Sequence, residues 1–448
     1  MSAADPAAGA VKESRKLGPV LATVLVAGNQ IGSGVYLLPV TLAAVGGASI
    51  LGWAVCTGGA LLLAAVFSLL AVVRPGATSM IGYVEEALGD YLGFQAGMTY
   101  WFSIWTGVVP IAVVATAYLS SFFPVLKQAY PGVACTIAVI WLFTAINVIG
   151  PKLMGRVGLV TLALGLAPVI AAGTFGWLYF KPEVYLGSWN VSGKPTALAL
   201  STLLVPIFWA FLGVESAAVA ASVVKNPRRD IPIASIGGTL LAGLVYMLAT
   251  TAISGIISAP QLQQTQSPFT DVFLRILGPA AAVLVTVCAI LKTSGTVGGW
   301  ILITGETTRA SAMLGHFPRL MARVSPNGSP VPALVVMAGL MSVVALLTIS
   351  KTLSAQFERV ISVSTILSLI VYVYVCLALL RFAPGFTGTG SRALARACAA
   401  AAILFCVAIT AMSLIGSRGL LITTVLVLAA TVPLWLGLRW AKRRRAIP

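Results

Sequence analysis

Residues 28–35 read Gly-Asn-Gln-Ile-Gly-Ser-Gly-Val, and residues 209–216 read Trp-Ala-Phe-Leu-Gly-Val-Glu-Ser. Both stretches interrupt long apolar segments with glycine and polar residues. In hydrocarbon an unsatisfied backbone group is costly, so a helix unwinds there only where protein, water or a ligand takes up the freed groups. Paired interruptions in two halves of a chain therefore predict a ligand site near the middle of a membrane. The alternative is that these glycines only let neighbouring helices pack closely.

The composition of the whole chain is that of a membrane protein. Of 448 residues, 59% are hydrophobic and 9% are charged, and the mean hydropathy is +1.00. A soluble domain carries about 25% charged residues, and an apolar run of about 20 residues is long enough to span a bilayer as a helix. Such runs recur along almost the whole length. We therefore expect an all-α polytopic membrane protein with no sizeable soluble domain and the lipid bilayer as its surroundings.

Apolar stretches between charged, proline and glycine residues predict twelve spans. They start near residues 18, 49, 95, 132, 157, 199, 232, 280, 331, 357, 396 and 419. Of the 28 Lys and Arg residues, 20 fall in one set of alternate loops and 7 in the other, while Lys292 lies inside a span. By the positive-inside rule both termini are expected in the cytoplasm, with the chain in a bacterial inner membrane.

The two interruptions lie five helices apart, which predicts an inverted repeat of helices 1–5 and 6–10 with broken helices 1 and 6. The expected organisation is a cytoplasmic tail at 1–16, the first repeat at 17–180, the second repeat at 199–382, two additional C-terminal helices at 394–440 and a basic cytoplasmic tail at 441–448. Residues 1–16 lack the apolar region and cleavage site of a signal peptide, so the first apolar run is expected to be a true span.

Several function classes are excluded by the residue pattern. The net charge of +17 sits between the apolar runs rather than in a basic stripe, so no nucleic-acid partner is expected. His316 is the only histidine and reads as an ordinary loop residue, and the cysteines are scattered; no metal site and no cofactor are expected. No phosphate-binding loop appears. Too few ionisable residues lie within the spans for a membrane-embedded enzyme, and the C-terminal tail is too short for a signalling domain.

Six segments carry a resemblance to a known family. They are GNQIGSGVYLLP at 28–39, YLSSFFPVLK at 118–127, NVIGPK at 147–152, WNVSG at 189–193, FLGVESAAVAASVVKNPRRDIPIASIGG at 211–238 and VGGW at 297–300. The chain resembles the basic amino acid/polyamine antiporters of the amino acid, polyamine and organocation (APC) superfamily from near residue 17 to near residue 380. The resemblance implies secondary active exchange of amino acids and their decarboxylated amines, arginine/agmatine-like, by alternating access. It also implies a possible homodimer through the last two helices.

The resemblance implies a set of substrate-binding residues. Ser33 and Gly34 match positions that hold the substrate carboxylate, which agrees with the affinity of helix N-termini for anions. Carbonyls at the positions of Gln30, Trp209 and Leu212 would accept from the α-ammonium. Trp209 would also stack on the substrate's side chain, although the residue alone reads equally as a packing aromatic. The remaining expected substrate-facing positions are Ser103, Ile104, Val108, Trp300 and Ser364.

Gating residues are implied in the same way, at Tyr100, Trp209, Glu215, Trp300 and Tyr372. Glu215 stands out physically, because an acid at mid-membrane is costly and normally faces the interior of the bundle. The hypothesis is that protonation of Glu215 biases opening of the gate. The alternative is a partly protonated carboxyl group that only takes part in packing.

Two positions depart from the family pattern. Val108 stands where the arginine-carrying members have an asparagine facing the guanidinium, and valine offers no acceptor to that group. Lys292 lies inside the eighth span, where it would carry a proton, repel a cationic substrate, or serve structure alone. Glu215 and Lys292 are therefore candidates for proton or charge coupling. The runner-up function is a proton-coupled permease for neutral or weakly basic amino acids that uses one of them.

Overall fold

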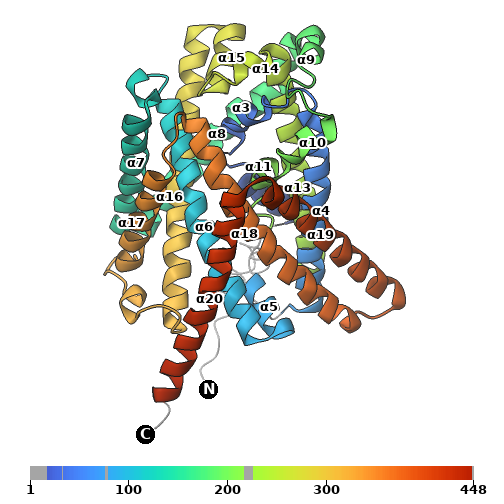
Figure 1. Cartoon of the computed structure of the whole chain (residues 1–448), viewed down its shortest axis with the longest axis vertical. Helices are drawn as coiled ribbons and strands as arrows, with labels where there is room; N and C mark the ends of the chain where they lie inside the picture. Colours follow the sequence, from blue (N-terminus) through green and yellow to red (C-terminus); the bar gives the residue numbers. More distant parts are fainter. Residues whose placement is uncertain (1–17, 33, 76–78, 216–225, 446–448) are drawn as a thin grey trace, which may run out of the picture.

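The computed structural model describes residues 18–32, 34–75, 79–215 and 226–445, and over these ranges it is helical with no strand. The long helices run roughly side by side along the long axis of the molecule (Figure 1). Eight of the described helices are long and apolar enough to cross a membrane. They are α4 (Ser49–Val73), α6 (Asp90–Leu119), α7 (Ala129–Ile149), α13 (Pro227–Ile256), α16 (Pro279–Met313), α18 (Leu353–Phe382), α19 (Thr389–Gly416) and α20 (Arg418–Arg445). The protein is therefore an all-α polytopic membrane protein.

Shorter helices complete the described chain. Three of them, α2 (Pro19–Gln30), α8 (Pro151–Thr174) and α17 (Val331–Leu347), contain shorter apolar stretches. The segments around the two glycine interruptions are η1 (Gly34–Tyr36), α3 (Leu38–Leu42), α10 (Thr196–Ser201) and α11 (Leu204–Trp209). The others connect the long helices: α5 (Met80–Leu88), η2 (Pro124–Lys127), η3 (Phe175–Tyr179), α9 (Pro182–Gly187), α14 (Ala259–Leu262), α15 (Pro268–Leu277), η5 (Arg319–Ala322) and η6 (Ala383–Gly385).

Several helices begin before the apolar runs that predict them. The spans expected from near residues 95, 157 and 396 belong to helices that start at Asp90, Pro151 and Thr389. A glycine directly precedes each of these starts, at 89, 150 and 388. Hydropathy marks the stretch that crosses hydrocarbon, whereas the helix itself begins at a backbone signal. The polar first turn of each helix therefore extends beyond the apolar run.

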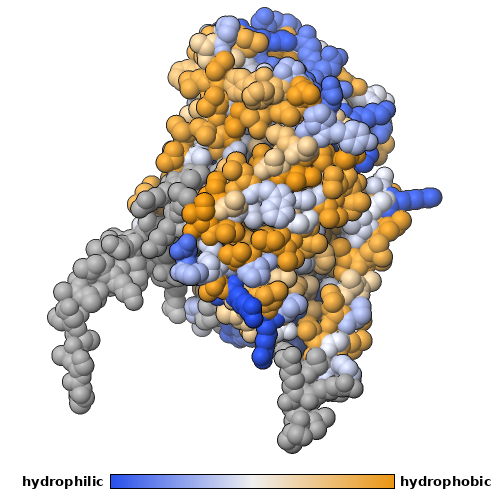
Figure 2. Space-filling model, turned by 90° about the vertical axis from the view of Figure 1, so that its left-hand side faces the viewer, coloured by the Kyte–Doolittle hydropathy of each residue, from blue (hydrophilic) through white to orange (hydrophobic). Residues whose placement is uncertain are grey.

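Helix α6 lies at the centre of the bundle and α19 and α20 lie at its edge. In the most apolar window of α6, 89% of residues are buried, against 22% in α19 and 11% in α20. Apolar side chains cover the mid-height of the face seen in Figure 2, and hydrophilic residues gather toward its top. This distribution suits a bilayer, because the surroundings of the outer helices are as apolar as the core.

Glycines let α16 and α8 approach closely. A Cβ atom on Gly165 would lie 2.1 Å from the Cβ of Lys292, and one on Gly295 would lie 1.9 Å from Oγ1 of Thr161. One on Gly298 would lie 2.3 Å from the sulfur of Met154. The hydrophobic effect does not drive helices together in lipid. Small residues at such crossings let the backbones approach closely, and the resulting van der Waals contact stabilises the packing.

Candidate functional site

The first apolar helix is interrupted at the predicted glycines. Helix α2 ends at Gln30, and the chain becomes helical again only at η1, which starts at Gly34. The amide of Ile31 still donates to the carbonyl of Ala27 (2.7 Å), and the amide of Gly32 turns back to the carbonyl of Gln30 (2.5 Å). Ser33, expected to hold the substrate carboxylate, lies outside the described residues. The backbone groups that follow the end of α2 therefore need partners outside the helix.

The second interruption follows α11. The helix ends at Trp209, and the next residues form tighter bonds of the i→i+3 kind, from the amide of Leu212 to the carbonyl of Trp209 (3.1 Å) and from Val214 to Phe211 (3.2 Å). Gly213 has φ +102°, a conformation that glycine adopts without steric cost. Residues 216–225, which follow, lie outside the described residues. Glycine thus ends this helix for a conformational reason and not only to allow close packing.

The two interruptions meet in space. A Cβ atom on Gly34 would lie 2.3 Å from the Trp209 ring, so the indole lies directly on the backbone of the first interruption. The hydroxyl of Tyr246, from α13, lies 2.5 Å from the carbonyl oxygen of Gln30 and 3.0 Å from that of Ala210. One hydroxyl proton cannot serve two carbonyls fully. The two carbonyls can therefore still accept a hydrogen bond from one more donor.

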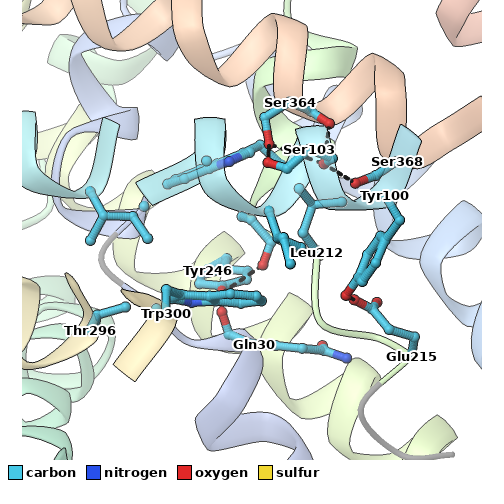
Figure 3. Close-up of a pocket in the computed structure, with 17 residues that line it drawn as sticks. Gln30, Tyr100, Ser103, Leu212, Glu215, Tyr246, Thr296, Trp300, Ser364 and Ser368 are labelled. Atoms are coloured by element: carbon cyan, nitrogen blue, oxygen red, sulfur yellow. Dashed lines mark hydrogen bonds between the residues drawn. The ribbon is translucent and has the colours of Figure 1, made fainter. Parts of the chain in front are cut away.

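A cavity lies between the interruptions, with about 580 Å³ of non-atom space, part of which is open to the outside. Figure 3 draws the 17 lining residues, and the ten that it labels converge from α2, α6, the residues after α11, α13, α16 and α18. Of the residues expected at the site, the following line it: Gln30, Gly34, Tyr100, Ser103, Ile104, Trp209, Leu212, Glu215, Trp300 and Ser364. The cavity is the only described place where these residues from distant segments come together.

Three serine hydroxyls form one end of the cavity, where α6 and α18 meet (Figure 3). Ser364 donates to the carbonyl of Ser103 (2.8 Å), and Ser103 donates to the carbonyl of Ser364 (2.7 Å). The hydroxyl oxygens of Ser103 and Ser368 are 2.6 Å apart, and since the proton of Ser103 is already in use, Ser368 is the donor. All three protons are thus used within the cluster. The serine cluster therefore presents only hydrogen-bond acceptors to the cavity. Such acceptors suit a ligand group that has hydrogen-bond donors and no acceptors.

Glu215 closes another side of the cavity with both oxygens bonded. Its carboxylate accepts from the hydroxyl of Tyr100 (2.8 Å), the hydroxyl of Tyr372 (2.6 Å) and the amide of Gly213 (3.1 Å). The residue is 9% exposed, so these three donors replace water around the carboxylate. Glu215 therefore links the second interruption to α6 and α18.

Three expected site residues do not line the cavity. Tyr372 reaches it only through Glu215. Val108 is fully buried, and it is the neighbouring Gly107 that lines the cavity; successive residues of a helix point about 100° apart, which turns Val108 away. Lys292 is 5% exposed, with its stem against Gly165 of α8. It lies one turn before Thr296, which does line the cavity.

Sequence reasoning missed seven lining residues: Gly32, Gly107, Ile111, Ala210, Tyr246, Thr296 and Ser368. Helical spacing could have found two of them, because Thr296 and Ser368 lie four residues from the expected Trp300 and Ser364 and so share their faces. Gly32 and Ala210 lie within the two quoted interruptions. Tyr246 has no such signal, since it stands alone in an apolar helix whose neighbours in sequence do not reach the site.

Comparison with known proteins gives a consistent picture. A family model described as amino acid permease matches residues 17–438. The cadaverine/lysine antiporter of Escherichia coli strain K12 is 35% identical over 378 residues, covering 83% of this chain and 85% of that protein. The putrescine transporter PotE of the same strain is 32% identical over 362 residues, covering 81% and 82%. PotE of Haemophilus influenzae is 30% identical over 360 residues, covering 80% and 83%.

Proposed function

Because the chain belongs to the amino acid permease family, a family of transporters and not of enzymes, we propose that it exchanges a basic amino acid for its decarboxylated amine by alternating access. Two similar proteins, named as a cadaverine/lysine antiporter and a putrescine transporter, support this proposal. The observation that carries it is the cavity lined by both helix interruptions. A carrier needs such a site because a polar solute in mid-membrane must replace its water with protein groups.

The shared chemistry of the two substrates agrees with this cavity. An amino acid and its decarboxylated amine have the same amino groups and differ in the carboxylate. The carbonyls of Gln30 and Ala210 offer acceptors to an ammonium, because Tyr246 supplies one proton for both. The backbone at Gly34 begins a helical segment beside Trp209 and would hold the carboxylate when it is present. Both substrates can then use one site, with the amine lacking one contact.

The serine cluster supports a primary ammonium at the far end of the substrate. Ser103, Ser364 and Ser368 present acceptors only, and an ammonium is a compact group with three donors. A guanidinium has five donors in a rigid planar fork and prefers a carboxylate or another bidentate acceptor. We therefore expect the protein to prefer substrates of the lysine/cadaverine or ornithine/putrescine kind over an arginine/agmatine-like pair.

Tyr100, Trp209, Glu215, Trp300 and Tyr372 are the proposed gating residues. Protonation of Glu215 would turn one carboxylate oxygen from an acceptor into a donor, so the bonds to Tyr100 and Tyr372 would lose the assistance of the negative charge. The contact between the second interruption and helices α6 and α18 would weaken in this way. The proton would thereby bias the gate.

The proposed layout is twelve spans with both termini in the cytoplasm of a bacterium and the bundle in its inner membrane. Helices 1–5 would form one repeat and helices 6–10 its inverted copy, followed by the two helices α19 and α20. Support comes from the two interruptions, at α2 and α11, and from the outer position of α19 and α20. These last two helices are the proposed contact in a homodimer.

Counterflow in proteoliposomes tests the proposed function. Vesicles loaded with lysine, ornithine, cadaverine, putrescine, arginine, agmatine or a neutral amino acid receive a labelled external substrate. Rapid uptake only into vesicles that hold a lysine- or ornithine-type substrate or its amine is the expected result. Uptake that needs no internal substrate would contradict exchange.

A second candidate is a proton-coupled permease for neutral or weakly basic amino acids. The observation that favours it is Lys292, a buried cation one turn from the cavity-lining Thr296. Empty vesicles with an imposed pH gradient separate the two functions. Uptake driven by that gradient, and lost in Lys292→Met, would favour the permease over the exchanger.

A further inference from the structure

A second hollow lies beside the second half of α20, the helix whose C-terminal end projects at the bottom of Figure 1. Helix α6, the second half of α20 and the loop after α16 line about 680 Å³ of non-atom space there, part of which is open to the outside. Phe94 and Met98 line it from α6, Phe317 from the loop, and Leu434, Gly437 and Leu438 from α20. Every lining residue except His316 is apolar. We refer to this hollow as the α6–α20 groove.

The inner wall of the groove is fixed and the outer wall is open. The Phe94 and His316 rings meet edge to face at 5.3 Å, and Phe317 packs on Trp101 at 4.8 Å, so aromatic contacts hold the loop against α6. On the other side, a Cβ atom on Gly437 would have no neighbour within 4 Å, and Leu434 is 47% exposed. Since α20 lies at the edge of the bundle, the groove opens on the outer surface of the molecule.

Arginines directly follow two of the lining residues in the sequence, and we refer to these arginines as the rim of the groove. Arg439 follows the lining residue Leu438, and its guanidinium lies 4.3 Å from the centre of the Trp435 ring. Arg319 follows the lining residue Pro318 and is exposed, as is Arg323 in the same loop. The two ion pairs of the described residues, Arg74–Glu86 and Arg309–Glu306, involve none of these three arginines. No carboxylate in the described part of the chain therefore neutralises the rim.

We propose that the α6–α20 groove binds an anionic phospholipid, with one acyl chain against Phe94, Met98 and Leu434 and the phosphate between Arg319 and Arg439. An apolar slot open to the bilayer suits a chain, and arginine pairs well with phosphate oxygens. Basic pockets between helices at a charged membrane face are where such headgroups bind. The net negative charge of the headgroup, which a zwitterionic lipid lacks, complements the rim.

The occupant would rest on the helix that lines the substrate cavity. Phe94 and Met98 lie on α6, as do Tyr100 and Ser103 of the site, and Trp101 contacts both Phe317 and Thr308 of α16, to which its indole donates at 2.8 Å. The binding itself does not depend on the proposed function, and it is measured without any substrate.

The test is native mass spectrometry of the full chain in detergent, titrated with phosphatidylglycerol or phosphatidylcholine. We expect one phosphatidylglycerol to bind at least fivefold more tightly than phosphatidylcholine. Gly437→Leu fills the groove and should weaken phosphatidylglycerol binding at least fivefold. The double variant Arg319→Gln/Arg439→Gln should remove the preference for phosphatidylglycerol. Gly419→Leu and Arg418→Gln, exposed at the other end of α20, are the matched controls and should bind as the unchanged chain does.

Three outcomes would overturn the proposal. Gly437→Leu could bind phosphatidylglycerol as tightly as Gly419→Leu, or the two lipids could bind equally to the unchanged chain. Removal of residues 2–16 could raise phosphatidylglycerol binding fivefold, which would make the N-terminal tail the occupant. If Gly437→Leu does not elute as a single species, the test is the comparison of Arg319→Gln/Arg439→Gln with Arg418→Gln. An unchanged preference for phosphatidylglycerol in the double variant would refute the site.

Discussion

Tyr246 joins the two interrupted helices through one hydroxyl group, which lies within hydrogen-bond distance of the carbonyls of Gln30 and Ala210. Tyr246→Phe removes this donor from both carbonyls; that of Gln30 still accepts from the amide of Gly32, whereas that of Ala210 is left unsatisfied, which costs about 1–3 kcal/mol for a buried group. We expect the half-saturating substrate concentration in counterflow to rise about tenfold, in line with about 1.4 kcal/mol. Tyr374→Phe loses a hydrogen bond to Gln95 away from the cavity and is the control. An equal rise in the half-saturating concentration in both variants would mean that Tyr246 contributes only to the stability of the fold.

The serine cluster sets the preference at the far end of the cavity. Ser368→Ala removes lone pairs from one side of the proposed ammonium site, and a hydrogen bond to a charged group contributes about 1.5–3 kcal/mol. Competition by diamines against labelled substrate should weaken about tenfold or more, whereas competition by a neutral amino acid should change little. Ser362→Ala on the same helix, whose hydroxyl bonds the carbonyl of Glu358, is the matched control. If competition by diamines and by the neutral amino acid weakened equally, the serine cluster would not be the site of the distal ammonium.

Glu215 is the proposed source of pH dependence at the gate, and the hydroxyls of Tyr100 and Tyr372 are the titratable groups that face it. An amide cannot change its charge, so Glu215→Gln should flatten the pH profile of exchange. Glu306→Gln, which removes a partner of Arg309 at the end of α16, should keep the original profile. Exchange by Glu215→Gln with an unchanged profile would assign the proton effect elsewhere.

The part of the cavity that could be predicted is the part encoded locally. Glycines at 32, 34 and 213 mark the interruptions within apolar runs: Gly213 has φ +102°, which favours glycine, and Gly34 leaves room for the Trp209 ring. Glu215 is visible because mid-membrane acids are costly. Tyr246 could not be found, since its role comes from the position of α13 beside both interruptions. The direction of Val108 likewise depends on the rotation of α6, which sequence does not supply.

Among the helices, the packing of α16 provides two neighbouring glycines with opposite surroundings. A Cβ atom on Gly298 would lie 2.3 Å from the Met154 sulfur, whereas one on Gly299 would have no neighbour within 4 Å. Overpacking costs about 1–3 kcal/mol, so Gly298→Ala should lower the melting temperature of the detergent-solubilised protein by several degrees. Gly299→Ala should leave it unchanged or raise it, because alanine favours helix by about 1 kcal/mol over glycine. Similar melting temperatures for the two variants would show that α8 and α16 do not meet at Gly298.

At the same scale, helix existence was predictable and helix length was not. Apolar runs indicated α6, α8 and α19, yet these helices start at Asp90, Pro151 and Thr389, within polar sequence that hydropathy does not register. The Gly residues directly before them carry the missing signal. The ends at Gln30 and Trp209 were predictable because their cause, glycine in an apolar run, lies in the sequence itself.

For the whole molecule, the asymmetry of charge predicts the orientation in the membrane. The C-terminal ends of α16 and α20 lie toward the same end of the molecule, at the bottom of Figure 1, and 20 Lys and Arg residues fall in one set of loops against 7 in the other. Positive residues stay in the cytoplasm during insertion because they resist translocation. The same asymmetry would hold Arg319 and Arg439 at the leaflet surface where anionic lipids are attracted to basic groups.

Reporter fusions test that orientation. A fluorescent protein that matures only in the cytoplasm, fused after Pro448, should be bright, while alkaline phosphatase at the same point should be inactive. Insertion of the two reporters at Gly193, in the loop before α10, should give the reverse pattern, because that loop belongs to the sparsely charged set. Active phosphatase after Pro448 would place the groove rim on the opposite leaflet. It would also mean that the path to Glu215 opens to the opposite side of the membrane. The pH on that opposite side would then control the proposed protonation of Glu215.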